Sequence, residues 1–250
     1  MAEQRVVWVT GGSTGIGRAT CAEFARAGYE VAVHYNSNHE EAEKTAQLVR
    51  AAGREALLVK GDVADAPTVR RIAREIEEGF GRIDVLVNNA GSLVGRSSLE
   101  EMDEEHWDRV MDINLKSVYL CSRAVLATMK RQGGGRIINV SSIAARNGGG
   151  AGASAYATAK AGVSTLTRAL AKELVSENIL VNAVEPGVIS TPFHDRFSTP
   201  EMRQRLTERI PMGREGYPEE TAGVILFLAS PASNYMLGQI LEVNGGQLLS

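Results

Sequence analysis

The sequence predicts an α/β fold in which helices cover both faces of a parallel sheet. Short runs rich in Val, Ile and Leu alternate with stretches of roughly 15 to 30 residues, most of which show helical spacing of their apolar residues. Because the strand runs are almost continuously apolar, each strand is expected to be buried on both faces. Alternation of such strands with helices indicates a doubly wound sheet.

Seven runs are the candidate strands. They cover residues 5–10, 30–35, 55–60, 83–88, 136–141, 179–185 and 239–244. Helical patterns such as GIGRATCAEFARAG and HEEAEKTAQLVRAAG lie between them. Trp8 is expected in the core of the first strand. The glycine clusters at 133–135 and 148–150 are too short for interdomain linkers, so we expect one domain over residues 1–250.

The composition argues against several classes of function. A formal net charge of -3 predicts no general attraction to nucleic acid or to an anionic membrane. The start of the chain, MAEQRVVWVTGG, has too short an apolar stretch for a membrane span and lacks the pattern of a signal peptide, so a cytoplasmic protein is expected. Cys21 and Cys121 are expected as small buried side chains rather than a disulfide or a metal pair. The 4 histidines lack metal-ligand spacing, so no metal site is expected.

The motif TGGSTGIG, residues 10–17, lies between the first strand and the first helix. Its glycines allow a tight turn and let a phosphate approach the positive end of the helix. The spacing differs from the G-x-G-x-x-G pattern, and no Gly-Lys-Ser/Thr follows, which excludes a P-loop. The position after the first strand nevertheless predicts a nucleotide site, to which we assign Gly11, Ser13, Thr14, Gly15, Ile16 and Gly17.

The end of the second strand predicts which dinucleotide binds. An acidic residue there would accept hydrogen bonds from the ribose of NAD and repel the extra phosphate of NADP, but the sequence is HYNSNHEE, with Tyr35 at this place. Tyr35, Asn36 and Ser37 are therefore expected beside an NADP(H) ribose, with NAD(H) as an alternative. His34 or His39 could add charge if protonated.

The end of the third strand offers a place for an adenine ring. Asp62 is expected to bind the edge of the ring and Val63 its face. By itself, Asp62 could equally cap the following helix.

Tyr156 and Lys160 stand four positions apart in SAYATAKAG and therefore share one face of a helix. An isolated pair of this kind is ordinarily a surface Tyr and a Lys that extends to solvent. In a site, however, a cation one turn away favours the phenolate and brings a phenol of pKa about 10 toward working pH, aided by an oxidised nicotinamide. Ser142, at the end of the fifth strand, can donate to a substrate oxygen. Small neighbours leave the phenol accessible.

These motifs together resemble the short-chain dehydrogenase/reductase family over essentially the whole chain. The resemblance is carried by TGGSTGIG (10–17), DV (62–63), NNAG (88–91), Asn114 in MDINL, Ser142 in NVSS, YATAK (156–160) and PG (186–187). It implies a single Rossmann-like domain with a seven-stranded parallel sheet and a nicotinamide cofactor. It also implies a catalytic tetrad of Asn114, Ser142, Tyr156 and Lys160.

The same resemblance assigns further residues to the cofactor. It implies that Asn89, Ala90 and Gly91 line the adenosine-ribose side, that Pro186, Gly187, Val188 and Thr191 flank the nicotinamide, and that Tyr156 and Lys160 also contact the cofactor. It makes Asn114 a water-holding link in a proton relay to Lys160, although by itself Asn114 is only a tolerated polar residue in a helical pattern.

The implied activity is the interconversion of a ketone and a secondary alcohol with NADP(H), with Tyr156 as acid and base. The chain is most similar to 3-oxoacyl-carrier-protein reductases, which would make an acyl thioester a candidate substrate. A sugar, polyol or other small-alcohol dehydrogenase is the alternative, and a non-catalytic NADP-binding sensor or scaffold is the alternative of another class. Glu177 departs from the basic residue that such reductases tend to present to their acidic carrier, leaving Lys130 and Arg131 as candidate contacts.

Two expectations concern the surroundings of the site. The segment at about 190–216, with Phe193, Phe197, Met202 and Met212, is predicted to be a helical lid over the carbonyl site, the alternative being an ordinary pair of surface helices. The resemblance also implies a homotetramer or homodimer, formed through the helices of Asn114 and Tyr156 and through the last strand.

Overall fold

The computed structural model describes residues 4–249 and has seven strands in this part of the chain. They are β1 (Arg5–Val9), β2 (Tyr29–Tyr35), β3 (Ala56–Lys60), β4 (Val85–Asn88), β5 (Gly135–Val140), β6 (Ile179–Pro186) and β7 (Ile240–Val243). All of them pair in parallel in one sheet, in the order β3-β2-β1-β4-β5-β6-β7. The predicted doubly wound α/β fold is confirmed. The domain predicted over 1–250 extends past the described residues at both ends.

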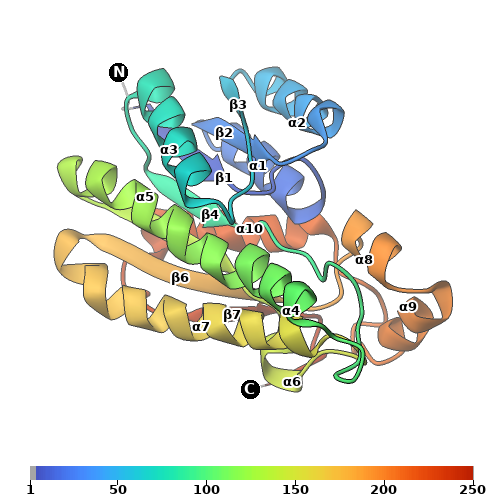
Figure 1. Ribbon diagram of the computed structural model, residues 1–250. Helices are drawn as coiled ribbons and strands as arrows, with labels where there is room; N and C mark the ends of the chain where they lie inside the picture. The colour runs from blue at the N-terminus through green and yellow to red at the C-terminus, as the bar shows by residue number, and fades with distance from the viewer. Residues whose placement is uncertain (1–3, 250) are drawn as a thin grey trace.

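The helices follow the strands as the sequence pattern predicts. They are α1 (Gly15–Arg26), α2 (His39–Ala51), α3 (Ala66–Phe80), α4 (Glu104–Met111), the π-helical η1 (Asp112–Lys116), α5 (Ser117–Arg131), α6 (Ala144–Asn147), α7 (Ser154–Leu174), η2 (Val175–Glu177), α8 (Pro192–Phe197), α9 (Pro200–Thr207), α10 (Pro218–Ala229) and η3 (Pro231–Ser233). Figure 1 shows α3, α5 and α7 in front of the sheet and α1 and α10 behind it.

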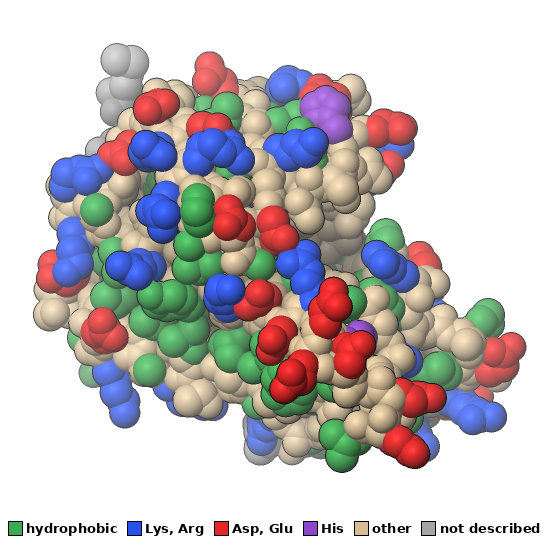
Figure 2. Space-filling view, in the orientation of Figure 1, with side chains coloured by type: hydrophobic (Ala, Val, Ile, Leu, Met, Phe, Trp, Pro, Cys, Tyr) green, Lys and Arg blue, Asp and Glu red, His purple; other side chains and the backbone are tan. Residues whose placement is uncertain are grey.

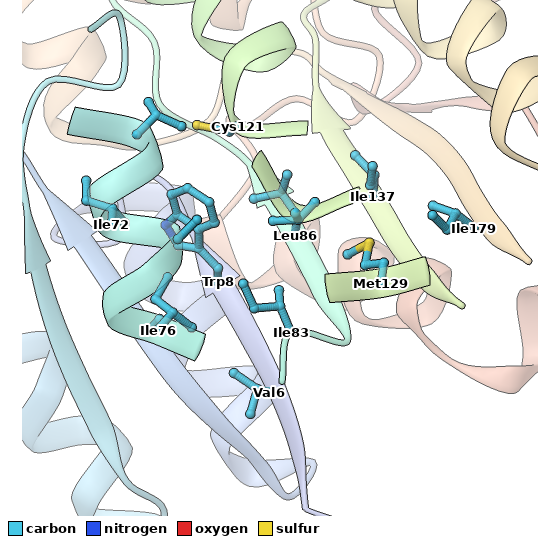
Figure 3. Close-up of a cluster of buried hydrophobic side chains, with 14 of the residues drawn as sticks. Val6, Trp8, Ile72, Ile76, Ile83, Leu86, Cys121, Met129, Ile137 and Ile179 are labelled. Carbon is cyan, nitrogen blue, oxygen red and sulfur yellow. The ribbon is translucent and has the colours of Figure 1, made fainter. Parts of the chain in front are cut away.

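Each face of the sheet has its own apolar core. On the α3, α5 and α7 side, Trp8 is fully buried among residues such as Ile72, Leu86 and Met129, as Figure 3 shows. On the other side, Phe24 of α1 and Ile225 of α10 belong to a second cluster. The two clusters explain why the strands read as continuous apolar runs, since alternate residues of each strand enter different cores. The predicted position of Trp8 is confirmed.

The order of the strands places the site. β1 pairs with β2 on one side and with β4 on the other, so the strand order changes direction at β1. In open α/β sheets, ligands bind at the carboxyl ends of the strands at such a point. At this point Asn89 N donates to the Thr10 hydroxyl over 2.9 Å, and Ala90 N donates to the same oxygen over 3.0 Å. The glycine-rich motif and the NNAG motif are therefore fixed against one another.

A row of buried polar side chains attaches α5 and α7 to the sheet. Asn88 of β4 donates to Asn139 of β5 over 2.9 Å and to Ser122 of α5 over 3.2 Å. Asn139 in turn donates to the Thr167 hydroxyl of α7 over 2.9 Å. Because buried polar groups are costly to leave unpaired, this row fixes how the two helices lie across the strands.

Two further findings concern residues 4–249. No helix in that range is long and apolar enough to cross a membrane, and no cluster of three or more His, Cys, Asp or Glu in it could hold a metal ion. The location in the cytoplasm stays a prediction. Cys21 and Cys121 are both buried, and burial raises the pKa of each thiol, so the prediction that they serve as small core side chains is confirmed.

Candidate active site

The candidate site lies beyond the carboxyl ends of four central strands. The glycine-rich motif follows β1, the segment 88–91 covers the end of β4, Ser142 follows β5, and the segment 186–191 leaves β6. Tyr156 and Lys160 come from the first two turns of α7. The structure therefore gathers the predicted site residues at one edge of the sheet, where ligands bind in open α/β folds.

The glycine-rich motif forms a backbone cradle at the start of α1. Gly11 and Gly15 adopt φ values of +63° and +53°, and a Cβ on Gly17 would lie 2.1 Å from Gly11 O and 2.6 Å from Asn89 Nδ2. Thr14 precedes the helix without capping it by its side chain. The backbone N–H groups of the first turn thus remain available for an anion, as a pyrophosphate requires.

Neighbouring side chains hold this cradle from the β4 and β6 sides. Asn89 Nδ2 donates to Thr10 O over 3.0 Å and to Gly11 O over 3.1 Å. A Cβ on Gly15 would lie 3.1 Å from Thr191 Cγ2, which shows how closely the segment after β6 approaches the motif. Gly187 N donates to Val243 O over 3.0 Å, and Val188 is buried, so this segment is fixed against β7. The residues present fit a dinucleotide.

At the adenosine end, the structure corrects one expectation. His34 is buried, and burial lowers the pKa of its imidazole to about 4. The ring is therefore neutral near pH 7, and the hypothesis that His34 could supply positive charge is wrong. Tyr35 is buried with its hydroxyl 2.9 Å from His39 Nδ1, whereas Asn36 and Ser37 are exposed beyond the strand.

Asp62 is held by neighbours that the sequence did not predict. Its Oδ1 accepts from Ala64 N over 2.9 Å, and its Oδ2 pairs with Arg109 of α4 over 2.9 Å. The residue that caps α3 is Asp65, which accepts from Thr68 N over 2.9 Å. The alternative that Asp62 caps this helix is therefore wrong. Val63 beside it is buried.

Asn114 is completely buried in the single π-helical turn η1. Its Nδ2 donates to Ser92 O over 2.6 Å and to Val110 O over 2.9 Å, while its Oδ1 accepts from Ser92 N over 3.1 Å. The amide therefore anchors the chain just after NNAG. Such π-helical turns occur frequently at functional sites. A role of Asn114 in a water relay stays a prediction.

Lys160 is a buried cation beside the phenol ring. It is 3% exposed, Nζ donates to Val140 O over 2.8 Å, and Nζ lies 5.7 Å from the centroid of the Tyr156 ring. A Cβ on Gly91 would lie 3.3 Å from the same Nζ. The alternative of a Lys that extends to solvent is wrong. Burial lowers the pKa of Lys160 to about 8.

Tyr156 is a weaker acid in the protein without cofactor than an ordinary phenol. Burial raises the pKa of its phenol to about 12, and a hydrogen bond with Ser142 opposes this rise. In the protein without cofactor, desolvation therefore determines the direction in which the pKa of Tyr156 moves. The expectation that Lys160 and the positive charge of an oxidised nicotinamide together bring the phenol toward working pH stays a prediction.

Comparisons with known proteins agree with this arrangement. A family profile described as enoyl-(acyl carrier protein) reductase matches residues 11–247. The chain is 40% identical over 241 residues to the 3-oxoacyl-[acyl-carrier-protein] reductase FabG of Staphylococcus aureus (strain N315), which covers 96% of this chain and 97% of that protein. It is 42% identical over 252 residues to the protein of the same name from Thermotoga maritima, covering 99% of each. The chain belongs to the short-chain dehydrogenase/reductase family.

This chain is also similar to a solved structure. The chain is similar to the crystal structure of acetoin dehydrogenase from Enterobacter cloacae, with a TM-score of 0.90, 34% identity and coverage of 99% of this chain and 96% of that one. This short-chain dehydrogenase/reductase is therefore an oxidoreductase that works with a nicotinamide cofactor. The family and the fold predicted from the sequence are confirmed.

In this short-chain dehydrogenase/reductase, α8 lies against the phenol. The rings of Tyr156 and Phe193 have centroids 5.8 Å apart, and Phe193 is 5.0 Å from Phe197. Met212, by contrast, is 62% exposed. Phe193 thus contacts the phenol directly and Phe197 packs against Phe193, while the closing motion of a lid stays a prediction.

Arg96 and Arg203 hold this segment, and sequence reasoning missed both. Arg96 Nε donates to Phe197 O over 2.9 Å, and its Nη1 donates to Ala151 O of the glycine-rich loop over 2.8 Å. Arg203 of α9 pairs with Glu215 and Asp195 and donates to the Ser190 hydroxyl. Each contact joins segments that are far apart or irregular, so no local pattern indicates it.

Proposed function

We propose that the chain is an NADP(H)-dependent reductase that converts the ketone of a 3-oxoacyl thioester to a secondary alcohol, and that the same site runs the reverse reaction. The observation that carries the proposal is the buried ammonium of Lys160, fixed by Val140 O beside the ring of Tyr156. Within residues 4–249 no carboxylate forms an ion pair with this ammonium, so an ion pair does not explain the buried charge, whereas stabilisation of a phenolate would.

We assign a different part of the dinucleotide to each group of proposed cofactor residues. Backbone groups of the glycine-rich motif would hold the pyrophosphate, Asp62 and Val63 the adenine, and segment 88–91 the adenosine side. Segment 186–191, with Pro186, Gly187, Val188 and Thr191, would flank the nicotinamide, and Lys160 would hold its ribose. When bound, the cofactor supplies or accepts the hydride.

In this mechanism Tyr156 donates its phenolic proton to the carbonyl oxygen as negative charge develops there. Ser142 donates a second hydrogen bond to the same oxygen, and its own oxygen accepts from Ala144 N over 3.1 Å, which orients it. The Lys160 ammonium then stabilises the phenolate that remains. Asn114 keeps the loop beside the ribose in place through Ser92.

Removing the phenolic hydroxyl tests the role of Tyr156. Tyr156→Phe should lower turnover of an acetoacetyl thioester by at least about 100-fold, because it removes a positioned proton donor, while cofactor affinity stays nearly unchanged. The matched control is Tyr235→Phe, since Tyr235 is a fully exposed tyrosine that lies outside both the site and α5. Undiminished turnover by Tyr156→Phe would refute the mechanism.

The lowered pKa of Lys160 predicts a pH dependence. The pKa of the ammonium is about 8, so the charge is present below that pH and is lost above it. Ketone reduction at saturating cofactor should therefore decline as pH rises through about 8. Initial rates from pH 6 to 10, with circular dichroism as a check of folding, provide the measurement. A rate that stays level up to pH 10 would contradict a charged Lys160 in the reaction.

The preference for NADP(H) rests on the absence of a carboxylate in the sequence at the end of β2. Asn36 and Ser37 offer neutral donors there, and the nearby Glu41 is paired with Arg18 and Lys44. A phosphate on the ribose would therefore have hydrogen-bond donors beside it, while the nearby carboxylate of Glu41 is already paired with cations.

Asn36→Asp would place a carboxylate at this point. It should lower kcat/KM for NADPH by about tenfold or more through charge repulsion and leave the value for NADH within about twofold. The control is Ser176→Asp, which adds the same charge on the exposed turn η2, away from β2. Equal effects of Asn36→Asp on the two cofactors would count against NADP(H) as the preferred cofactor.

Two salt bridges on the surface argue against a carrier protein as partner. Lys130 pairs with Glu177 over 2.8 Å, and Arg131 pairs with Glu77, so both candidate basic contacts are already paired with carboxylates. We therefore propose the thioester itself as the recognised substrate. The likeness to acetoin dehydrogenase supports a second candidate, the interconversion of a small diketone and its hydroxyketone.

An NADPH-consumption assay compares an acetoacetyl thioester, diacetyl and a ketose. We expect kcat/KM to be highest with the thioester. A clear preference for diacetyl would select the second candidate.

Assembly into a homotetramer or homodimer stays a proposal. Figure 2 shows hydrophobic side chains gathered over α5 and α7. Tyr119 of α5 is 44% exposed and Trp107 of α4 is 38% exposed. Large apolar side chains exposed on neighbouring helices support a subunit interface there.

A further inference from the structure

We propose that His34 is a positioning residue that couples the glycine-rich motif to the end of β3 and thereby sets the affinity for the cofactor. The inference rests on the dinucleotide site proposed above. His34 lies near the end of β2, between the two segments it would couple, and it takes no part in the proposed proton transfer.

Both ring nitrogens of His34 contact backbone groups. Gly11 N lies 3.0 Å from Nδ1, and Gly61 O lies 2.9 Å from Nε2. The backbone adds parallel contacts, since Gly12 N donates to His34 O over 2.8 Å and Gly61 N donates to Tyr35 O over 3.0 Å. The ring is 2% exposed, so water does not replace either partner.

These contacts select one form of the imidazole. Gly11 N can only donate, so Nδ1 must carry no hydrogen; Gly61 O can only accept, so Nε2 must carry one. Only the neutral tautomer with hydrogen on Nε2 satisfies both. Burial favours this neutral form by lowering the pKa, although the nearby Asp62 charge acts in the opposite direction.

The two segments held by His34 serve different parts of the proposed cofactor site. Gly11 begins the phosphate cradle with φ of +63°, and its carbonyl is held from the other side by Asn89. Gly61 immediately precedes Asp62 and Val63, the proposed adenine contacts. One ring therefore fixes the separation between the pyrophosphate end and the adenine end. A cradle that must be ordered during binding would bind more weakly.

Three substitutions separate the two hydrogen bonds. In His34→Asn the amide oxygen takes the place of Nδ1 and keeps the acceptor for Gly11, while in His34→Gln the amide reaches only the place of Nε2. His34→Ala removes both. We expect the cofactor Kd to rise less than about threefold for His34→Asn, about tenfold for His34→Gln and more for His34→Ala. His106→Ala, on α4, is the control and should leave the Kd unchanged.

The measurements are the Kd for NADP(H) by calorimetry on the cofactor-free protein, kcat at saturating cofactor, and hydrogen exchange of the 10–17 segment. The proposal predicts a raised Kd, a kcat within about twofold of the wild type, and faster exchange of this segment in His34→Ala, with rescue by His34→Asn. Circular dichroism confirms folding, and the comparison of His34→Gln with His34→Asn provides the test if His34→Ala does not fold.

The outcomes distinguish this inference from the proposed function. If the wild type binds neither NADP(H) nor NAD(H), the proposed function itself fails. If the wild type binds and the His34 variants bind equally well, only the role of His34 is overturned. Loss of affinity in His34→Asn as large as that in His34→Gln would also overturn it, since the Gly11 contact would then have no special importance.

Discussion

The hydrogen bond from the buried Lys160 ammonium to Val140 O is the constraint on which the site depends. A charged group is costly to bury, so its head must have a fixed partner, and the partner here is the last residue of β5. This bond requires α7 to cross the end of β5 closely. Gly162 also allows α7 to pack closely on η1, since a Cβ there would lie 2.7 Å from Leu115, and the Asn139 bond to Thr167 fixes α7 to β5 further along. The phenol, the cation and Asn114 are thereby brought to one edge of the sheet.

Much of the fold follows from local sequence because the strands are buried on both faces. Continuous apolar runs predict six of the strands to within one residue at each end. The exception is β4, predicted from residue 83 but observed from Val85. Ile83 is buried like a strand residue, yet its backbone N and O pair with the side chain of Gln132 instead of a neighbouring strand. The pattern of burial is local, whereas the identity of the hydrogen-bond partner is not.

The same distinction between local and non-local features applies to the candidate site. Residues at strand ends and in short motifs could be predicted, because the topology brings the carboxyl ends of parallel strands together. The contacts of Arg96 with Phe197 and Ala151 could not, since backbone carbonyls of irregular segments leave no periodic signal. The pKa shifts of His34 and Tyr156 in the protein without cofactor could not be predicted for a different reason. Residue type gives only the ordinary pKa, about 6.5 for a histidine and about 10 for a tyrosine. Desolvation, which depends on the packing of distant segments, determines the direction in which each pKa moves.

The central claim is that the charge of the oxidised cofactor, added to that of Lys160, overcomes the burial of Tyr156. NMR of the protein labelled with 13C at Cζ of tyrosine tests it most directly, with the Tyr156 signal assigned by its loss in Tyr156→Phe. Without cofactor the account predicts a pKa of about 12 for Tyr156, and with saturating NADP+ a pKa lowered to roughly 9 or below. A Tyr156 signal that titrates at the same high pH with and without NADP+ would contradict the account.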